Sequence, residues 1–162
     1  MGDLVVVDGL AAYFRLLFIF TGLAVVLFAW TSEEIMGPRR ENKGEFYALI
    51  LFCLAGMYLM LHTTHLMMVL IGLEVFSLAL YVMTGMTRGR VRSIESALKY
   101  FLLGAFSSGF MVYGMALLYG YSGGTGYADI AAAIGQGTQP VLLLAAGLGL
   151  MMRSEERFSR NA

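Results

Sequence analysis

One stretch of 42 residues, from Phe46 to Thr87, carries a single formal charge, Glu74. As one continuous helix it would run about 63 Å, roughly twice the ~30 Å thickness of a membrane's hydrocarbon core. The chain must therefore fold back inside this stretch. Its one polar break is the sequence HTTH, His62 to His65, which predicts a hairpin between two membrane spans.

Composition supports a membrane protein for the chain as a whole. Hydrophobic residues make up 59% of the 162 residues and charged residues 14%, whereas soluble domains have roughly 45–50% apolar and about 25% charged residues. The formal net charge is zero, so nothing indicates a nucleic-acid partner. The single cysteine, Cys53, lies in an apolar run. It is interpreted as a small buried hydrophobic residue, because a lone cysteine forms neither an internal disulfide nor a CxxC metal pattern.

Three further apolar segments complete the expected architecture. Ala12–Trp30 and Ile94–Tyr121 are long enough to span a bilayer, whereas the run from Val141 to Met152 is too short. Spans of about 19 to 28 residues without strict alternation favour helices over membrane strands. We therefore expect an all-α integral membrane protein with four transmembrane helices and a truncated fifth. The expected helices are Ala12–Ser32, Gly44–His62, Leu66–Thr87, Ser93–Tyr121 and a short one from Val141.

Two smaller patterns concern packing and connection. Gly104 and Ser108, and likewise Ala105 and Gly109, are spaced four residues apart in the fourth span, a spacing that favours close helix packing. The sequence SGGTGYADIAAAIGQGTQP that follows this span predicts a glycine-rich surface loop with a short helix.

Basic residues indicate the orientation. They gather in two connecting segments: Arg39, Arg40 and Lys43 in loop 33–45, and Arg88, Arg90 and Arg92 in loop 87–93. Two spans separate these loops, so both lie on the same side of the membrane. The positive-inside rule places them in the cytoplasm, and the first span then runs from outside to inside.

The last ten residues, RSEERFSRNA, differ abruptly from what precedes them. Five of these ten residues, Arg153 to Ala162, are charged. One interpretation is a polar tail on either side of the membrane. The decapeptide also resembles the in-frame translation of a common short-read sequencing adapter, and we favour that interpretation. We therefore expect residues 153–162 to be an artefact that packs against nothing specific, and the natural protein to continue beyond Met152.

Glu74 lies near the middle of its span. A charge at mid-bilayer costs roughly 2.5–3.5 kcal/mol on insertion scales, and intramembrane carboxylates usually face a bundle interior or a wet cavity. One interpretation is structural: the carboxyl stays protonated or hydrogen-bonds to Ser77, one turn further on. The other is a proton or ion relay, in which desolvation and a nearby lysine have opposite effects on the carboxyl's proton affinity.

Four other polar residues are candidates for a site. Glu95 and Lys99 have the favourable i,i+4 order, and Lys99 lies about 9 Å into the fourth span, counted from Ser93. They form either a structural pair near the interface, with a snorkelling lysine, or a station on a charged path. His62 and His65 bracket the turn and are interpreted as capping or packing residues, since two histidines alone do not make a metal site.

Three stretches carry a family resemblance: GEFYALILFCLAGMYLM, LIGLEVFSLALYVM and RSIESALKYFLLGAFSSGFMVYGMALLYG. They resemble the subunit N family of the bacterial NADH-quinone oxidoreductase, respiratory complex I, one of its antiporter-like membrane subunits. The resemblance covers Val5 to Met152 and is strongest from Gly44 to Gly120. It implies that residues 1–152 are part of a fold of about fourteen transmembrane helices with two inverted five-helix repeats. The spans here would then be helices three to six, and Val141 would open helix seven.

The resemblance also implies roles for three residues in a proton-translocation path. Glu74 matches the glutamate of helix five, which pairs with a lysine of the broken helix seven. Glu95 and Lys99 match the charged pair of helix six. Ala79 departs from the family, which usually has proline there, and the helix-seven lysine would lie beyond Met152.

The function implied is proton translocation coupled to electron transfer from NADH to quinone in the bacterial inner membrane. The partners implied are the lipid bilayer and the other membrane-arm subunits. We expect no cofactor in this chain, because NADH, FMN, iron–sulfur clusters and quinone would be bound by other subunits. The alternatives are a subunit of a multisubunit cation/proton antiporter or membrane hydrogenase, and a purely structural membrane protein.

Overall fold

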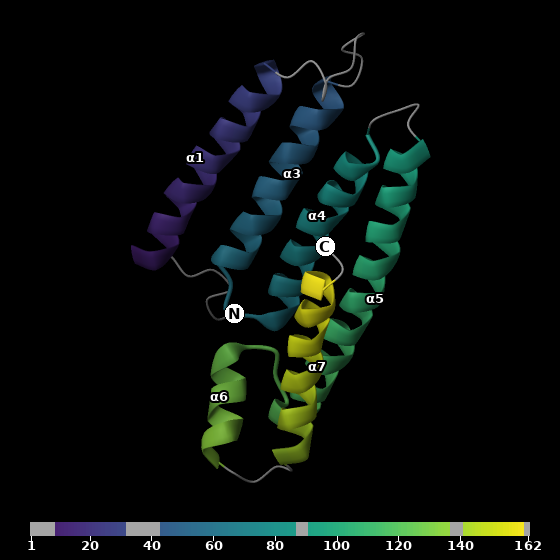
Figure 1. The fold of residues 1–162 in the computed structure, drawn as a ribbon. Helices are drawn as coiled ribbons and strands as arrows, with labels where there is room; N and C mark the ends of the chain where they lie inside the picture. The colour runs from purple at the N-terminus through teal and green to yellow at the C-terminus, as the bar shows by residue number, and fades with distance from the viewer. Residues whose placement is uncertain (1–8, 32–42, 87–90, 137–140, 161–162) are drawn as a thin grey trace.

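The chain forms a bundle of long helices with a short helix at one end (Figure 1). The computed structural model describes residues 9–31, 43–86, 91–136 and 141–160, the side chains of residues 43, 141 and 153–160 excepted. The helices are α1 (Gly9–Thr31), α3 (Lys43–Leu61), α4 (Leu66–Thr84), α5 (Val91–Ser122), α6 (Tyr127–Gln136) and α7 (Val141–Arg160).

Four of the described helices, α1, α3, α4 and α5, are long and apolar enough to cross a membrane. Their ends lie within three residues of those expected from the apolar runs, so the prediction of four transmembrane helices is confirmed. The hairpin is confirmed as well, because α3 ends at Leu61 and α4 begins at Leu66. The short helix predicted in the glycine-rich segment is α6.

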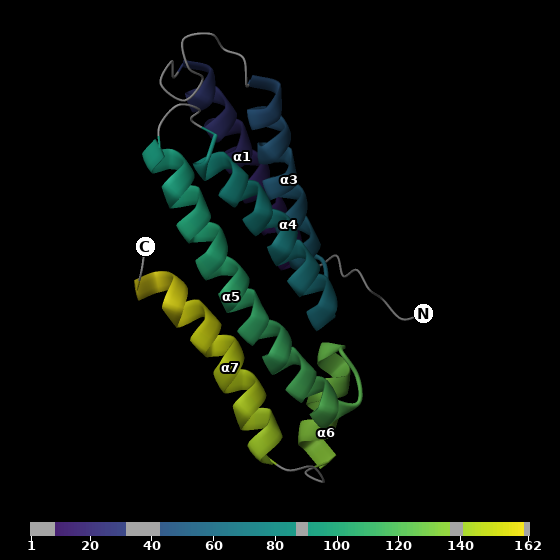
Figure 2. The same cartoon turned by 90° about the vertical axis from the view of Figure 1, so that its right-hand side faces the viewer.

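The four spans alternate in direction, which places the predicted basic loops on one side. The end of α1, the start of α3, the end of α4 and the start of α5 all lie at the same end of the bundle (Figures 1 and 2). This arrangement agrees with the expectation that loops 33–45 and 87–93 share a side of the membrane. Residues 32–42 and 87–90 themselves lie outside the described part of the chain.

Two pairs of glycines let neighbouring helices approach closely. A Cβ on Gly56 of α3 would lie 2.5 Å from the carbonyl oxygen of Gly72 in α4. Similarly, a Cβ on Gly114 of α5 would lie 2.8 Å from the carbonyl oxygen of Gly147 in α7. Because these are backbone contacts, any side chain at these positions would separate the helices.

The expected packing role of the small residues in α5 is only half right. Gly104 is buried against Tyr81 of α4, as the spacing predicted. Ala105 and Gly109 are exposed, and a Cβ on Gly109 would meet nothing within 4 Å. The second pair therefore contacts no other helix among the described residues, because it is rotated about 100° around the helix from the first, away from α4.

The turn between α3 and α4 is bonded to the loop between α5 and α6. The Leu66 amide donates to the Thr125 carbonyl, the Tyr127 amide donates to the Thr64 carbonyl, both at 2.9 Å, and His65 and Gly126 form an isolated antiparallel bridge. His62 packs on Tyr58, with ring centroids 5.9 Å apart and nearly parallel planes. The packing interpretation therefore holds for His62, whereas the His65 side chain makes no cap on α4.

The last helix is longer than its apolar run predicts. The apolar part ends at Met152, but α7 continues to Arg160. Arginine and glutamate are good helix formers, so the polar sequence does not end the helix. The expectation that residues 153–162 pack against nothing specific concerns side chains outside the described part of the structure.

Candidate functional site

Glu74 lies in the third turn of α4, two residues after the close contact of Gly72 with α3, and its side chain is half-buried. Among the described residues, its carboxylate has no hydrogen bond or ion pair. One of the two forms of the structural interpretation, a hydrogen bond between Glu74 and Ser77, is absent there, since Ser77 hydrogen-bonds instead to the side chain of Tyr81. Glu74 is thus left without a hydrogen-bonding or ion-pairing neighbour among the described residues.

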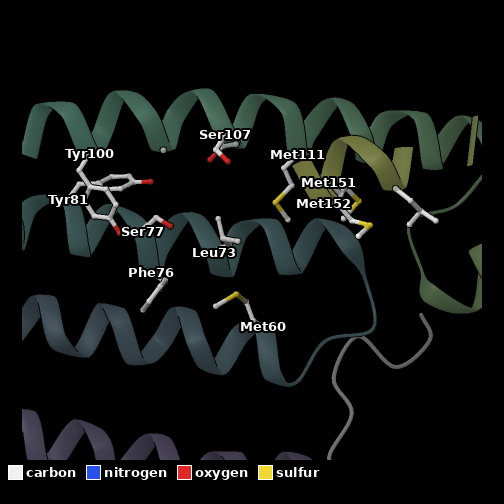
Figure 3. A pocket seen from close by; sticks show the side chains of 13 residues that line it. Met60, Leu73, Phe76, Ser77, Tyr81, Tyr100, Ser107, Met111, Met151 and Met152 are labelled. Atoms are coloured by element: carbon white, nitrogen blue, oxygen red, sulfur yellow. The ribbon is translucent and has the colours of Figure 1, made fainter. Parts of the chain in front are cut away.

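A pocket of about 530 Å³ lies between α4, α5 and α7 (Figure 3), and Glu74 is not among the described residues that line it. One end is rich in hydroxyl groups and the other in methionines. The hydroxyl end is lined by Ser77, Tyr81, Tyr100, Ser107 and Ser108, and the methionine end by Met60, Met111, Met151 and Met152. Leu73 and Ser77, which flank Glu74 on α4, both line the pocket.

Tyr81 organises the hydroxyl end. Its ring is buried and meets Tyr100 and Phe101 edge-on, with centroids 4.8 Å and 5.8 Å away. Its hydroxyl lies over Gly104, where a Cβ would collide with it. Tyr81 is also within electrostatic reach of Glu74. Sequence reasoning missed Tyr81, although residues seven apart share one face of a helix.

Glu95 and Lys99 form the expected i,i+4 ion pair on α5, with Nζ and Oε1 2.5 Å apart. Both side chains are exposed on the surface of the described bundle, Lys99 by 74% and Glu95 by 55%. The two charges therefore neutralise each other within one turn of α5.

The structure does not bring this pair to Glu74. Gly85 packs against Ala97, and Tyr81 against Gly104, which fixes the register of α4 on α5. Glu74 then lies opposite residues 108–111 of α5, and Lys99 is about 14–18 Å away along the helix axis. No three of the described His, Cys, Asp and Glu residues gather as a metal site would require.

Two other residues that the sequence analysis named, Ala79 and Cys53, are buried in their helices. Ala79, where a proline was expected, is buried in an unbroken part of α4. Cys53 is buried on α3 with its Sγ 3.9 Å from the Phe76 carbonyl oxygen, as its interpretation as a small hydrophobic residue predicted.

Comparison with known proteins identifies the family to which the chain belongs. A family model described as "NADH:quinone oxidoreductase/Mrp antiporter, TM" matches residues 63–154. The chain belongs to this family. The matched segment includes Glu74, Glu95 and Lys99 and all the hydroxyl residues of the pocket. The residues of the candidate site therefore lie within the segment that the family model describes.

Individual relatives show which members of the family this chain is similar to. The chain is 44% identical over 152 residues to the NADH-quinone oxidoreductase subunit N of Trichlorobacter lovleyi, covering 93% of this chain and 30% of the relative. It is 48% identical over 133 residues to subunit N 2 of Solibacter usitatus, covering 82% and 26%. These matches confirm the resemblance to the subunit N family. The chain spans less than a third of the length of these curated relatives.

Solved structures share the arrangement of the helices. Respiratory complex I from Thermus thermophilus contains a chain that superposes with a TM-score of 0.73 and 34% identity, covering 94% of this chain and 31% of that one. The membrane-bound sulfane sulfur reductase, an archaeal respiratory membrane complex, gives 0.71 and 26%, covering 87% and 28%. The antiporter-family fold is thus common to respiratory complexes with different names.

Proposed function

We propose that this chain is part of a subunit N of a proton-pumping NADH-quinone oxidoreductase. In this role it takes part in proton translocation coupled to electron transfer from NADH to quinone. The support is the identity of 44% and 48% to proteins of that name, together with the similarity to a chain of respiratory complex I.

The position of Glu74 is the observation that carries the proposal. A carboxylate in the middle of a span is costly to keep charged, and the described residues give it no ion pair and no hydrogen bond. A purely structural carboxyl would be expected to hydrogen-bond to its neighbours. A relay group needs freedom to gain and lose a proton, and a lysine outside the described residues would complete its pair.

The proposal also includes the membrane, the orientation and the partners of the subunit. We place it in the bacterial inner membrane with loops 33–45 and 87–93 in the cytoplasm, because their arginines and lysine follow the positive-inside rule. Its partners would be the lipid bilayer and the other subunits of the membrane arm. NADH, FMN, iron–sulfur clusters and quinone would be bound elsewhere in the complex.

A second candidate is a subunit of a cation/proton antiporter or of another respiratory membrane complex. The family description includes the Mrp antiporters, and the fold similarity to the archaeal sulfane sulfur reductase supports the same breadth. In this case ion movement would follow a different driving reaction, whereas the role of Glu74 would be the same.

The two candidates differ in what drives proton movement. Inverted membrane vesicles are prepared from cells that contain or lack the gene for the full-length subunit. NADH with a quinone acceptor should acidify the vesicle lumen only when the gene is present, and an imposed sodium or potassium gradient should give the same signal with and without it. Loss of the cation-driven signal with an intact NADH-driven signal would overturn the proposal in favour of the antiporter.

A further inference from the structure

Arg15 is a cation in the second turn of α1, about 9 Å from the start of a membrane-spanning helix. Its side chain is exposed, and it has no ion pair with any of the described residues. A charged side chain within a span is costly, and such groups are almost always paired or carried to the membrane interface. Arg15 therefore calls for an anion that the described residues do not supply.

Arg15 lies at one end of the contact between α1 and α3. Residues seven apart share one face of a helix, and Arg15, Gly22 and Ala29 follow this spacing. Ala29 packs in a buried cluster with residues near the start of α3. A Cβ on Gly22 would lie 2.9 Å from Cδ1 of Leu54, and the Tyr58 hydroxyl lies 3.5 Å from the backbone oxygen of Arg15. The arginine thus follows two small residues along the line where the helices meet.

The depth of Arg15 in the membrane follows from its neighbour on α3. Tyr58 lies one turn before the end of α3 at Leu61 and stacks on His62. The polar turn that starts at His62 marks the membrane surface, so the backbone of Arg15 lies about 5 Å below it. Side chains of a helix lean toward its N-terminus, and α1 begins at this end of the bundle (Figure 1). The arginine stem can therefore carry the guanidinium to the level of the lipid headgroups.

The surface on the membrane side of Arg15 is apolar. Ile19 and Leu23, one and two turns further along α1, are both exposed large hydrophobic residues. A phospholipid has the complementary arrangement, with a phosphate at the interface and acyl chains below it. The guanidinium fork matches phosphate oxygens with two parallel hydrogen bonds, and basic groups between spanning helices bind lipid headgroups.

We propose that Arg15 binds the phosphate of an anionic phospholipid at the end of the bundle opposite the basic loops. The headgroup lies where α1 and α3 meet at Tyr58, and an acyl chain follows Ile19 and Leu23 toward the middle of the membrane. With the basic loops in the cytoplasm, this lipid belongs to the outer leaflet. The inference needs only the spanning helices and is independent of the proposed function.

Arg15 offers two variants that separate charge from shape. The complex containing the full-length subunit is placed in nanodiscs with phosphatidylglycerol that carries a photoactivatable diazirine beside its headgroup. Illumination should attach this lipid to the first half of α1 in the parent, less in Arg15→Lys, which keeps the charge but not the fork, and several-fold less in Arg15→Gln. Equal attachment in Arg15→Gln and the parent would overturn the assignment.

Arg92→Gln is the matched control, because Arg92 is also an exposed arginine near a helix start, but at the other end of the bundle. In this variant the lipid should attach to α1 as it does in the parent. The same loss as in Arg15→Gln would mean that attachment reports the total charge of the protein, and would overturn a site at Arg15.

Competition distinguishes a lipid site from a site for any anion. Unlabelled phosphatidylglycerol should displace the photoactivatable lipid from α1 at a lower mole fraction than phosphatidylcholine, whose headgroup has no net charge. An excess of inorganic phosphate should displace none of it. Equal displacement by the two lipids, or displacement by inorganic phosphate, would overturn the proposal.

A protein anion is the remaining alternative, and it is tested at Ile19. The photoreactive residue benzoylphenylalanine at position 19 of the assembled complex should form adducts that add the mass of a phospholipid to the peptide. Cross-linking to another polypeptide segment instead would show that protein covers this face, and the proposal would fall. These measurements use neither NADH nor proton movement, so their failure leaves the proposed function untouched.

Discussion

Which side chains fit at a position in this chain depends chiefly on the neighbouring side chains in the apolar interior of the bundle. Tyr81 illustrates this, because its hydroxyl is accommodated only by the absence of a side chain at Gly104. The hydroxyl bonds to Ser77, and the ring is held by Tyr100 and Phe101. A single atom added at position 104 therefore acts on the Tyr81 hydroxyl and, through it, on Ser77.

Gly104→Ala should destabilise the full-length subunit by about 1–3 kcal/mol, because its Cβ overlaps the Tyr81 hydroxyl and forces the ring out of its place. Gly109→Ala is the matched control on the same helix, where a Cβ meets nothing within 4 Å. It should be neutral or stabilise the helix by about 0.5–1 kcal/mol. Thermal denaturation of the purified complex checks both, and an equal effect of the two substitutions would contradict the packing described for Gly104.

Lys99 should matter less than Glu74. It is exposed, forms a pair with Glu95 one turn away, and lies near enough to the helix end to snorkel. Lys99→Ala should therefore lower NADH-driven proton translocation less than Glu74→Gln does, and Lys99→Arg should lower it less again because the charge remains. A larger loss in Lys99→Arg than in Glu74→Gln would show that the exposed pair, rather than Glu74, is the critical group.

At the scale of helices and turns, packing depends on a few close contacts. The glycine pairs Gly56–Gly72 and Gly114–Gly147 bring backbones together. The turn between α3 and α4 is tied to the loop before α6 by backbone hydrogen bonds. These contacts join two hairpins that are separate along the chain and position α4 between α3 and α5.

The bridge between His65 and Gly126 can be trapped covalently. Paired residues on antiparallel strands have Cα atoms about 4.5–5.5 Å apart, within the range that a disulfide needs. With Cys53 replaced by alanine, the His65→Cys, Gly126→Cys variant should form an intramolecular disulfide on mild oxidation, detected by mass spectrometry. The His62→Cys, Gly126→Cys variant should not, and equal cross-linking of both would contradict the bridge.

Much of this element-level structure followed from hydropathy, because a span must be apolar over its whole length wherever its neighbours lie. The helix ends were therefore predictable to within three residues, and Glu74 stood out as the one charge between Phe46 and Thr87. The rotation of each helix about its axis is set by tertiary contacts. For that reason the sequence did not distinguish Gly104, which packs against Tyr81, from Gly109, which meets no other helix in the described part of the chain.

The candidate site, like the helices, was predictable from the sequence only in part. Glu74 and the Glu95–Lys99 pair were predictable from composition and spacing alone. The hydroxyl end of the pocket was not predictable, because Ser77 and Tyr81 belong to α4 while Tyr100, Ser107 and Ser108 belong to α5. Only the register of the two helices brings their hydroxyls together. The bridge at His65 was missed for the same reason, since its partner is 61 residues further along the chain.

For the molecule as a whole, the orientation in the membrane decides which solution would supply the protons in the proposed function. The helix ends that carry the basic loops share one end of the bundle (Figure 1), and the HTTH turn lies at the other. With Cys53 replaced, Arg90→Cys should be labelled by an impermeant maleimide only in inverted vesicles, and Thr63→Cys only in right-side-out cells. The reverse pattern would invert the orientation that the arginine count predicts.

Glu74 is proposed to take part in moving protons, and Glu74→Gln tests this role most directly because it removes the charge with little change in volume. Removal of one partner of a buried pair costs about 3–5 kcal/mol, so assembly of the complex is checked alongside. Glu45→Gln, the same change in the first turn of α3, serves as control. We predict that in proteoliposomes of the assembled complex the protons translocated per NADH oxidised fall in Glu74→Gln and stay at the parent value in Glu45→Gln. An unchanged ratio and unchanged quinone reduction in Glu74→Gln would contradict the account and leave Glu74 a structural group.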